Sequence, residues 1–537
     1  MKTLLVGINA KYIHTNLAIR LLKVNSDYPV DIKEFTIKDD PDKVLEYVNQ
    51  YDLVGFSCYI WNIEYIKALL KKIDRKVIVL LGGPEVSYNP KEYIDNFNVS
   101  YVIKNEGEIA FNSLLDALIN GKPINHIQNL VTKDFENETC EIENLKLLKS
   151  PYYLPNDLKN RITYIETSRG CPFNCSYCLA SRENTVRYFD LNTIKKDLLY
   201  LMENGAKVFK FLDRTFNLNK KHTLDLFSFI IENHYPNTSF QFEITGDILA
   251  SEIIDYVNKH APKNLIRFEI GVQTTNNLAN SLVDRHQNIE KLFENIKKIR
   301  DANVIDLHLD LIAGLPNETY ESFSKSFDEV ISLRPLELQL GFLKFLKGTK
   351  LYSEIDLYDY KFQKDPPYEI ISSKTLSRQE LDKIRVVERV LEKYYNSQFM
   401  NTTINYILDN VTSPFNFFLD FGTFYEQNYS WFKYNLDDLF VYLINFLQKI
   451  NFKNIDYCKF LLKYDYLKYF KIKPKIWWKR LSRKENNNLL RKLHSSILSN
   501  YSLDELYRYG IVERYENLYL FAIYMEKRQD VFIYEKK

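Results

Sequence analysis

Short apolar runs alternate with amphipathic stretches over residues 1 to about 125. The apolar runs predict β-strands at Leu4–Asn9, Val30–Thr36, Leu53–Cys58, Lys76–Leu81 and Tyr101–Lys104. Helical spacing appears between them, at Asn16–Lys23, Asn62–Ile73 and Glu108–Asn120. This alternation predicts a parallel, doubly wound, Rossmann-like α/β sheet. Ligands of such sheets bind beyond the carboxyl ends of the strands, so we expect a cofactor at the turns after these strands.

A second alternating pattern begins at residue 161. Before it, residues 126–160 contain a polar stretch and the pair Ser150-Pro151, which is typical of a linker. The strands then predicted are Arg161–Thr167, Val208–Leu212, Phe240–Ile244, Leu265–Gly271, Asp306–Ile312 and Leu338–Leu343. Six strand-helix units predict a partial (β/α)6 barrel of the TIM type over residues 161–370, with its site at the C-terminal face.

Residues 371–537 have a different pattern. Long helices are predicted at Ser377–Ser397 and Leu436–Ile450, and a β-pair at Leu518–Tyr524 and Asp530–Tyr534. The sequence therefore predicts an N-terminal domain over 1–125, a linker over 126–160, a barrel, and a mainly helical C-terminal domain. No motif assigns a role to that last domain.

The composition indicates a folded protein and bears on whether nucleic acid is a partner. Of the 537 residues, 45% are hydrophobic and 26% charged, as in folded soluble proteins. The net charge of +2 gives no general argument for nucleic acid, which is not expected as a partner. The run Lys471–Arg480 mixes basic and aromatic residues, which leaves an RNA surface open beside a solvated face with anchoring aromatics.

The chain has no run of about 18 apolar residues, so no membrane span is expected. Its N-terminal apolar run is not followed by a cleavage-site pattern and is interpreted as a first strand rather than a signal peptide. We therefore expect a cytoplasmic protein.

Three of the six cysteines, Cys171, Cys175 and Cys178, fall within eight residues directly after the first barrel strand. Thiolates at this spacing can ligate three irons of a 4Fe-4S cluster and leave the fourth iron open, as a catalytic metal site requires. A structural zinc or electron-transfer site would normally use four ligands, and no fourth cysteine lies nearby. The other three cysteines are interpreted as core or surface thiols.

This motif, with Tyr177 before its last cysteine, resembles that of the radical S-adenosylmethionine (SAM) enzymes. The resemblance implies that the open iron chelates SAM and that one electron cleaves it to a 5′-deoxyadenosyl radical. Three further segments resemble the SAM-contacting turns of the family: Phe211–Asn217, Phe268–Gln273 and Ala313–Pro316. The SAM contacts implied by the resemblance are Asp213, Arg214, Glu269, Gln273 and Gly314. Alternatives remain, since Asp213 can form a barrel-end salt bridge and Gly-Leu-Pro can be a plain turn.

Residues 1–125 resemble the cobalamin-binding domain that precedes the barrel in one branch of this family. The resemblance rests on the loops Val54–Asn62, Leu81–Ser87 and Asn105–Glu108, whose glycines let a backbone approach a bulky ligand. The cobalamin contacts it implies are Ser57, Tyr59, Trp61, Gly82, Gly83, Pro84, Glu85, Glu106 and Gly107. An aromatic side chain of the first loop would cover the lower corrin face or pack against the sheet.

His14 follows the first strand but lacks the Asp-x-His-x-x-Gly pattern of histidine-ligated cobalamin. It is therefore either an axial ligand or, as we favour, a capping or surface histidine. The methylthiotransferase branch carries three further cysteines in its N-terminal domain. Here that domain holds Cys58 alone, so a second cluster is not expected.

The resemblance implies a cobalamin-dependent methyltransferase that transfers a methyl group to an unactivated carbon. The alternative is cobalamin-assisted cyclisation, rearrangement or oxidation without methyl transfer, and a third is a binding or sensing module without turnover. An external electron donor of the flavodoxin or ferredoxin type is expected. The substrate, a small molecule or a peptide, is not identified by the sequence.

Overall fold

The structure is a computed structural model of the full chain, and it describes residues 1–183, 185–471, 473–474, 477–479, 481–526 and 528–536. The chain divides into two compact units. One comprises residues 1–320 and 340–378, and the other comprises residues 321–339 and 379–537. Within the described residues, no helix is long and apolar enough to cross a membrane.

The N-terminal domain is a six-stranded sheet in the order β2-β1-β3-β4-β5-β6. Its strands are β1 (Thr3–Asn9), β2 (Asp31–Thr36), β3 (Leu53–Ser57), β4 (Ile78–Gly82), β5 (Tyr101–Ile103) and β6 (Leu130–Val131). The first five are parallel, and β6 pairs antiparallel to β5 at the edge. The predicted Rossmann-like sheet is confirmed, with the addition of β6.

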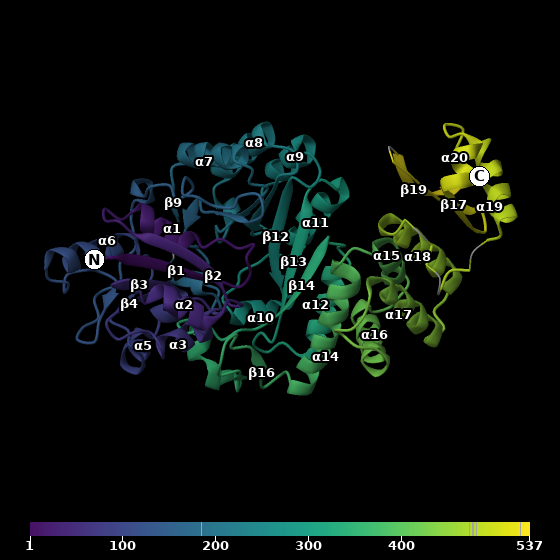
Figure 1. Ribbon diagram of the computed structural model, residues 1–537. Helices are drawn as coiled ribbons and strands as arrows, with labels where there is room; N and C mark the ends of the chain where they lie inside the picture. The colour runs from purple at the N-terminus through teal and green to yellow at the C-terminus, as the bar shows by residue number, and fades with distance from the viewer. Residues whose placement is uncertain (184, 472, 475–476, 480, 527, 537) are drawn as a thin grey trace. The chain divides into compact units, whose positions relative to one another are not determined.

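Helices cover both faces of this sheet (Figure 1). Helices α1 (Leu17–Val24) and α6 (Glu108–Asn120) enclose one apolar core with residues such as Phe111. The other core lies under α2 (Pro41–Val48), α3 (Ile63–Leu70) and α5 (Pro90–Asn96). Because both faces are covered, the central strands are mostly apolar, and every residue of β3 is buried. The short helix α4 (Pro84–Ser87) follows β4 directly.

The central domain is a second six-stranded sheet in the order β14-β13-β12-β11-β10-β7. Its strands are β7 (Thr163–Ile165), β10 (Val208–Phe211), β11 (Ser239–Ile244), β12 (Ile266–Gln273), β13 (Asp306–Ala313) and β14 (Glu337–Phe342). The order has β7 and β14 at its two edges, so the barrel is open and partial, as predicted. Along β12 buried and half-buried residues alternate, which separates an apolar face from a polar one.

Helices follow the strands of the partial barrel on its outer side (Figure 1). They are α7 (Leu191–Glu203), α8 (Lys220–Asn233), α9 (Ser251–His260) and α11 (Ile289–Ala302). The short helix α10 (Asn277–Leu282) ends instead beside Ser176, whose N donates to Val283 O at 2.9 Å, and α12 (Tyr320–Ile331) follows β13 in the chain. After β14 come α13 (Lys350–Ser353) and a small pair, β15 (Lys361–Phe362) and β16 (Ile370–Ser372). A two-stranded hairpin, β8 (Ser168–Arg169) and β9 (Arg187–Tyr188), frames the three-cysteine loop after β7.

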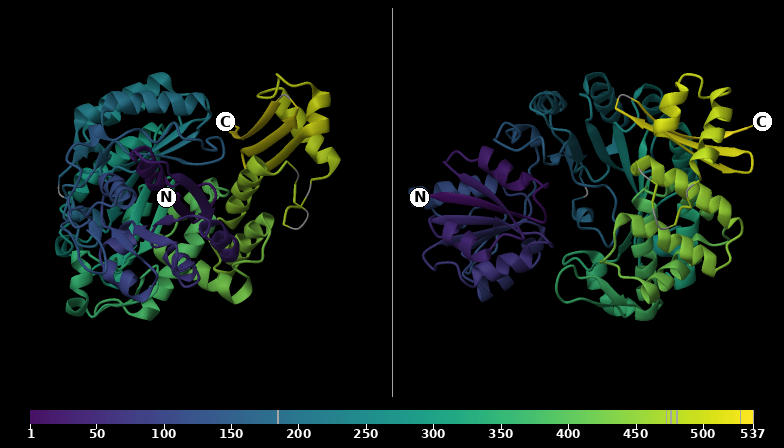
Figure 2. Two further views of the ribbon diagram at one scale, coloured as in Figure 1. Left: turned by 60° about the vertical axis from the view of Figure 1, so that its left-hand side comes forward. Right: turned by 45° about the vertical axis from the view of Figure 1, so that its right-hand side comes forward.

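The C-terminal part is mainly helical, as predicted. Its helices are α14 (Arg378–Val390), continued by a π-helical turn (Leu391–Asn396), α15 (Asn401–Asp409), α16 (Pro414–Asn428), α17 (Leu436–Lys449), α18 (Ile455–Tyr469), α19 (Arg483–His494) and α20 (Leu503–Tyr509). The predicted β-pair, β18 (Leu518–Met525) and β19 (Arg528–Glu535), is joined by β17 (Gly510–Tyr515) in an antiparallel sheet. Helices α19 and α20 pack on this sheet (Figure 2).

The basic and aromatic run at 471–480 lies partly outside the described residues, namely at 472, 475–476 and 480. In its described part, Trp478 is buried and its Nε1 donates to Glu513 Oε1 at 2.7 Å. Lys473 Nζ donates to the same oxygen at 2.7 Å. These two side chains therefore anchor the run to β17, as the solvated-face interpretation with anchoring aromatics expects.

Candidate functional site

The three clustered cysteines lie in the loop framed by β8 and β9, beyond the carboxyl end of β7. Cys171 and Cys175 are buried, Cys178 is half-buried, and none is in a disulfide. Cys171 N donates to Glu183 O at 2.8 Å, which ties the start of the loop to its end. Gly170 has φ +91°, and a Cβ there would lie 2.2 Å from Thr185 O, so only glycine fits before the first cysteine.

One arginine that the sequence pattern did not single out reaches this loop. Arg285, just after α10, lies with Nη1 3.8 Å from Cys175 Sγ and 3.4 Å from Tyr177 Oη. Its Nη2 donates to Gly271 O. A guanidinium beside a sulfur stabilises the thiolate form, which is the form that binds a metal. No spacing rule marks Arg285, because it reaches the loop across 110 residues of chain.

Asp213, predicted to receive the SAM ammonium, lies at the end of β10 and is fully buried. Its carboxylate accepts hydrogen bonds from Thr167 N at 3.1 Å, Thr167 Oγ1 at 2.5 Å and Ser168 Oγ at 2.6 Å. Burial raises the pKa of Asp213 to about 6, against the lowering effect of these bonds. The carboxylate thus fixes the turn before the cysteine loop, and its contact with SAM stays a prediction. Arg214 beside it is exposed.

Glu269 and Gln273 lie four residues apart on the polar side of β12. Glu269 accepts from Lys210 Nζ at 3.2 Å and from Gln241, so its charge is paired within the barrel. Carboxylate and imidazole atoms of Glu269, His308 and Asp310 lie within 4.8 Å of one another, but Lys210 already supplies a cation there.

Gln273 ends β12 with φ +65°, a backbone conformation that is uncommon outside glycine. A register shift between Gly271 and Gln273 accompanies it. The side-chain Oε1 of Gln273 is buried and has no hydrogen-bond partner among the described residues. A buried acceptor left open at a strand end fits a ligand donor at this position.

Gly314 follows β13 with φ +101°, and its carbonyl accepts from Tyr360 Oη at 2.9 Å. Glu318, which the sequence analysis did not single out, is fully buried in the same segment. Thr274, in the turn after β12, donates to Glu318 Oε1, while Oε2 has no partner in the described part of the chain. Burial raises the pKa of Glu318 to about 8, although the Thr274 hydrogen bond lowers it. Glu318 therefore links the turns after β12 and β13.

The predicted glycine pair of the N-terminal domain forms a tight turn between β4 and α4. Gly82 O accepts from Cys58 N at 2.7 Å. Gly83 has φ +111°, and a Cβ there would lie 2.5 Å from Cys58 O. Pro84 then starts α4 at a position where its missing N–H costs nothing. The loops after β3 and β4 are thus in direct backbone contact.

Tyr59 and Trp61, after β3, stack with ring centroids 4.3 Å apart and planes 6° apart. Trp61 is 48% exposed, and its Nε1 donates to Ile8 O at 3.3 Å. An aromatic stack whose tryptophan is exposed, at the carboxyl edge of the sheet, suits a flat apolar ligand. Ser57 is buried and its Oγ accepts from Asn16. His14 Nδ1 is 2.7 Å from Tyr164 Oη of β7, a partner consistent with a structural histidine.

Two predicted acidic residues of this domain bond to the central domain. Glu85 is buried and accepts from Tyr368 Oη. Glu106, between β5 and α6, accepts from Arg169 and Arg187. Gly107 is the N-cap of α6. For both glutamates a contact with cobalamin stays a prediction, and protein groups already bind their carboxylates.

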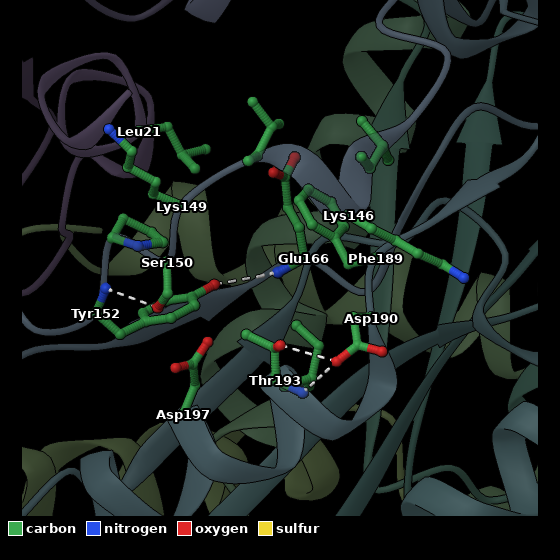
Figure 3. A pocket seen from close by; sticks show the side chains of 14 residues that line it. Leu21, Lys146, Lys149, Ser150, Tyr152, Glu166, Phe189, Asp190, Thr193 and Asp197 are labelled. Carbon is green, nitrogen blue, oxygen red and sulfur yellow. Dashed lines mark hydrogen bonds between the residues drawn. The ribbon is translucent and has the colours of Figure 1, made fainter. Parts of the chain in front are cut away.

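A pocket is lined by residues of α1, of α7 and of the segment 145–152 (Figure 3). It is lined by Leu21, Leu145, Lys146, Leu148, Lys149, Ser150, Pro151, Tyr152, Glu166, Phe189, Asp190, Thr193, Ile194 and Asp197. Tyr152 Oη accepts from Glu166 N at 3.4 Å, and burial raises the pKa of Asp197 to about 6. Residues 145–152 therefore pack between α1, α7 and the end of β7.

Three family models match successive parts of the chain. Residues 3–115 match the B12 binding domain, residues 165–330 match the Radical SAM superfamily, and residues 356–526 match a protein family of unknown function, DUF4080. The chain combines a B12-binding domain with a radical SAM domain. The predicted resemblance is thereby confirmed, since the chain carries both domains and is related to cobalamin-dependent radical SAM methyltransferases.

Two curated relatives carry the name of methyltransferase. An uncharacterized methyltransferase of Pyrococcus horikoshii is 31% identical over 211 residues, 36% of this chain and 44% of its own. The cobalamin-dependent radical SAM methyltransferase TokK of Streptomyces tokunonensis is 23% identical over 300 residues, 51% of this chain and 44% of its own. The chain thus spans under half the length of each relative.

A solved structure shares the fold. The radical SAM methyltransferase TsrM of Kitasatospora setae, solved with cobalamin and a [4Fe-4S] cluster, matches with a TM-score of 0.57 at 16% identity. The match covers 66% of this chain and 75% of TsrM. The two domains found here are thus arranged in a fold known to hold both cofactors in TsrM.

The B12-binding domain offers a test of its glycine turn. We expect Gly83→Ala to lower stability by about 1–3 kcal/mol, because alanine strains the left-handed backbone and meets Cys58 O. Gly82→Ala is the matched control, since its Cβ would lie 3.6 Å from the nearest atom, Ile103 O. Thermal unfolding of both variants measures the difference. Equal melting temperatures would contradict this account of the turn.

Glu318 predicts a pH dependence in the radical SAM domain. An unfolded glutamate has a pKa of about 4.3, whereas the folded pKa is about 8. Stability from this group is therefore fully present below the unfolded pKa and is lost as pH rises through the folded one. We expect Glu318→Gln to melt at a higher temperature than the wild type above pH 8, with the difference vanishing near about pH 4.

The control for this pH profile is Glu321→Gln, because Glu321 is exposed three residues further on. Its melting temperature should follow the wild type across the whole range. If Glu318→Gln does the same, burial of a carboxyl group at this position does not control stability.

Proposed function

We propose that the protein holds a 4Fe-4S cluster on Cys171, Cys175 and Cys178, binds SAM in the radical SAM domain and cobalamin in the B12-binding domain, and transfers a methyl group to an unactivated carbon. The observation that carries the proposal is the three-cysteine loop at the carboxyl edge of the partial barrel, in the same compact unit as the B12-binding domain.

The cysteine loop fits a three-ligand cluster. Its thiols are free and mostly buried, and Cys175 lies beside the guanidinium of Arg285. Three thiolates leave one iron of a cube open for a substrate or cofactor. When bound, the cluster supplies one electron for cleavage of SAM, and cobalamin supplies the methyl group. Arg285 stabilises negative charge at Cys175, and the closed turn at Gly170 restricts where the loop can move.

The proposed SAM site contains a polar side-chain atom that has no hydrogen-bond partner among the described residues. Gln273 presents a buried acceptor at the end of β12. Gly314 lets the turn after β13 pack closely, since a Cβ there would lie 2.6 Å from Ile370. The role of Glu318 is to keep the turns carrying these two residues together through Thr274. Asp213 and Glu269 already accept hydrogen bonds from Thr167 and Lys210, respectively. Because these bonds fix the two carboxylates, we propose that they contribute to the site by defining its shape.

The cobalamin site fits the carboxyl edge of the N-terminal sheet. The stack of Tyr59 and Trp61 offers a flat apolar surface, and the turn at Gly82-Gly83 offers backbone without side chains. Ser57 and Glu85 are buried and bonded within the protein, so they set the shape of the edge. Methyl transfer is favoured over other radical outcomes because both curated relatives named above are methyltransferases.

The test begins with protein purified and reconstituted without oxygen. We expect about four irons per chain and one bound corrin. Given SAM and a reductant, the protein should form 5′-deoxyadenosine, and it should form S-adenosylhomocysteine only when cobalamin is present. The triple variant Cys171→Ala, Cys175→Ala, Cys178→Ala should lose the iron and the 5′-deoxyadenosine.

The control is Cys140→Ala, which removes a half-buried thiol outside the loop. This variant should keep the bound iron and the formation of 5′-deoxyadenosine. 5′-Deoxyadenosine without cobalamin-dependent S-adenosylhomocysteine would refute methyl transfer and favour rearrangement or oxidation. Iron that remains in the triple variant would overturn the cluster assignment.

A further inference from the structure

The hairpin that frames the cysteine loop pairs two arginines directly across its strands. Arg169 of β8 is opposite Arg187 of β9, and the three cysteines all lie in the segment between them. Their side chains are 11% and 8% exposed. Like charges directly opposite each other destabilise a strand pair unless an anion lies between them. The frame of the cysteine loop therefore depends on a counter-charge.

Glu106 of the B12-binding domain supplies a counter-charge to both arginines. Its Oε1 accepts from Arg169 Nη1 at 3.2 Å and its Oε2 from Arg187 Nη1 at 2.9 Å. Ile142 N also donates to Oε2, at 2.5 Å. Among the described residues, Glu106 is the one carboxylate bonded to both strands of the hairpin.

The other carboxylates around the hairpin each contact a single arginine. Glu108 and Glu166 pair with Arg169 at 2.7 and 3.0 Å. Glu141 and Glu183 pair with Arg187 at the longer distances of 3.5 and 3.4 Å and are about one-third exposed. They neutralise charge, but none of them joins β8 to β9.

Two routes lead from Glu106 to the first cysteine. Arg169 lies two residues before Cys171 in the chain. Arg187 contacts Glu183, whose carbonyl accepts from Cys171 N at 2.8 Å. A displacement of the Glu106 carboxylate is therefore transmitted to both ends of the cysteine loop.

We propose that Glu106 is a positioning residue that shapes the cysteine loop from the neighbouring domain, so that the cluster site is complete only with the B12-binding domain in contact. The inference rests on the proposed function, since it concerns the cluster that this loop is proposed to hold. It gives Glu106 a partner in the protein in place of a direct contact with cobalamin. It also joins the loop after β5, at the carboxyl edge of one sheet, to the loop after β7 of the other.

The fold provides a matched control in Glu34. This glutamate lies in the N-terminal domain with its side chain 11% exposed, and it also bonds an arginine of the barrel segment, Arg161, at 2.5 Å, together with Arg20 at 3.1 Å. Arg161 precedes β7, whereas the cysteine loop follows it. Glu34→Gln therefore weakens the contact between the domains without touching the hairpin.

The experiment compares the full-length wild type, Glu106→Gln and Glu34→Gln, each reconstituted with iron and sulfide. Two quantities are measured: the chelator concentration that removes the iron, and the electron paramagnetic resonance spectrum of the reduced cluster. Outer-shell changes commonly cost about 10–100-fold in metal affinity, so we expect Glu106→Gln to release iron at roughly tenfold less chelator. Its spectrum should shift, while Glu34→Gln should match the wild type in both measurements.

A second variant separates positioning from misfolding. Glu106→Asp keeps the charge but is one methylene shorter, so it can reach one arginine and not both. We expect it to melt like the wild type and still to show the shifted spectrum. Far-ultraviolet circular dichroism of all variants checks the fold.

Three results would overturn the inference. In the first, Glu106→Gln keeps the wild-type spectrum and iron retention. In the second, Glu34→Gln loses iron equally, which would implicate the whole domain contact. In the third, Glu106→Gln lowers only cobalamin binding, which would make Glu106 a ligand. A wild type that binds no iron would instead refute the proposed function.

Discussion

Buried carboxylate–guanidinium contacts determine how the B12-binding and radical SAM domains meet. Glu34 pairs with Arg161 at one end of β7, and Glu106 pairs with Arg169 beyond the other end. Charges removed from water are tolerated only with close partners, and a shifted domain would leave them unpaired. Hydrophobic contact alone permits sliding, whereas paired charges specify one arrangement. The geometry of both proposed cofactor sites depends on this arrangement.

Both domains build their sites by the same topological rule. Parallel strands end at a common edge, so loops far apart in sequence converge there. In the N-terminal domain these are the loops after β3, β4 and β5, and in the barrel those after β7, β10, β12 and β13. The chain itself binds many of the polar groups at these edges. Asp213 secures the turn before the cysteines, and Glu85 accepts from Tyr368.

Several groups remain open at these edges in the described part of the chain, and three of them are chemically distinct. These are the thiols of the cysteine loop, the buried Oε1 of Gln273 and the exposed ring of Trp61. Each suits a different part of the proposed cofactor set: a metal, a hydrogen-bond donor and a flat apolar face. Protein groups that are already bonded, such as Glu318 with Thr274, keep the open groups in position. Fixed supporting contacts of this kind are what a reactive site needs.

The sequence by itself determined the order of strands and helices, the partial barrel and the cysteine loop. These features are local: strand and helix periods, the spacing of Cys171, Cys175 and Cys178, and glycines where a turn requires positive φ. It missed β6 and β17, since short or edge strands carry little periodicity.

The tertiary structure alone decided which groups each polar residue contacts. Arg285 reaches Cys175 across 110 residues, and Glu106 reaches Arg187 across 81. The sequence shows which kind of group a residue can bind. Which of many equivalent charges becomes its partner depends on how the folded chain packs. For that reason the same glutamate that resembles a cofactor contact in the sequence is, in the fold, bonded to the arginines that frame the cysteine loop.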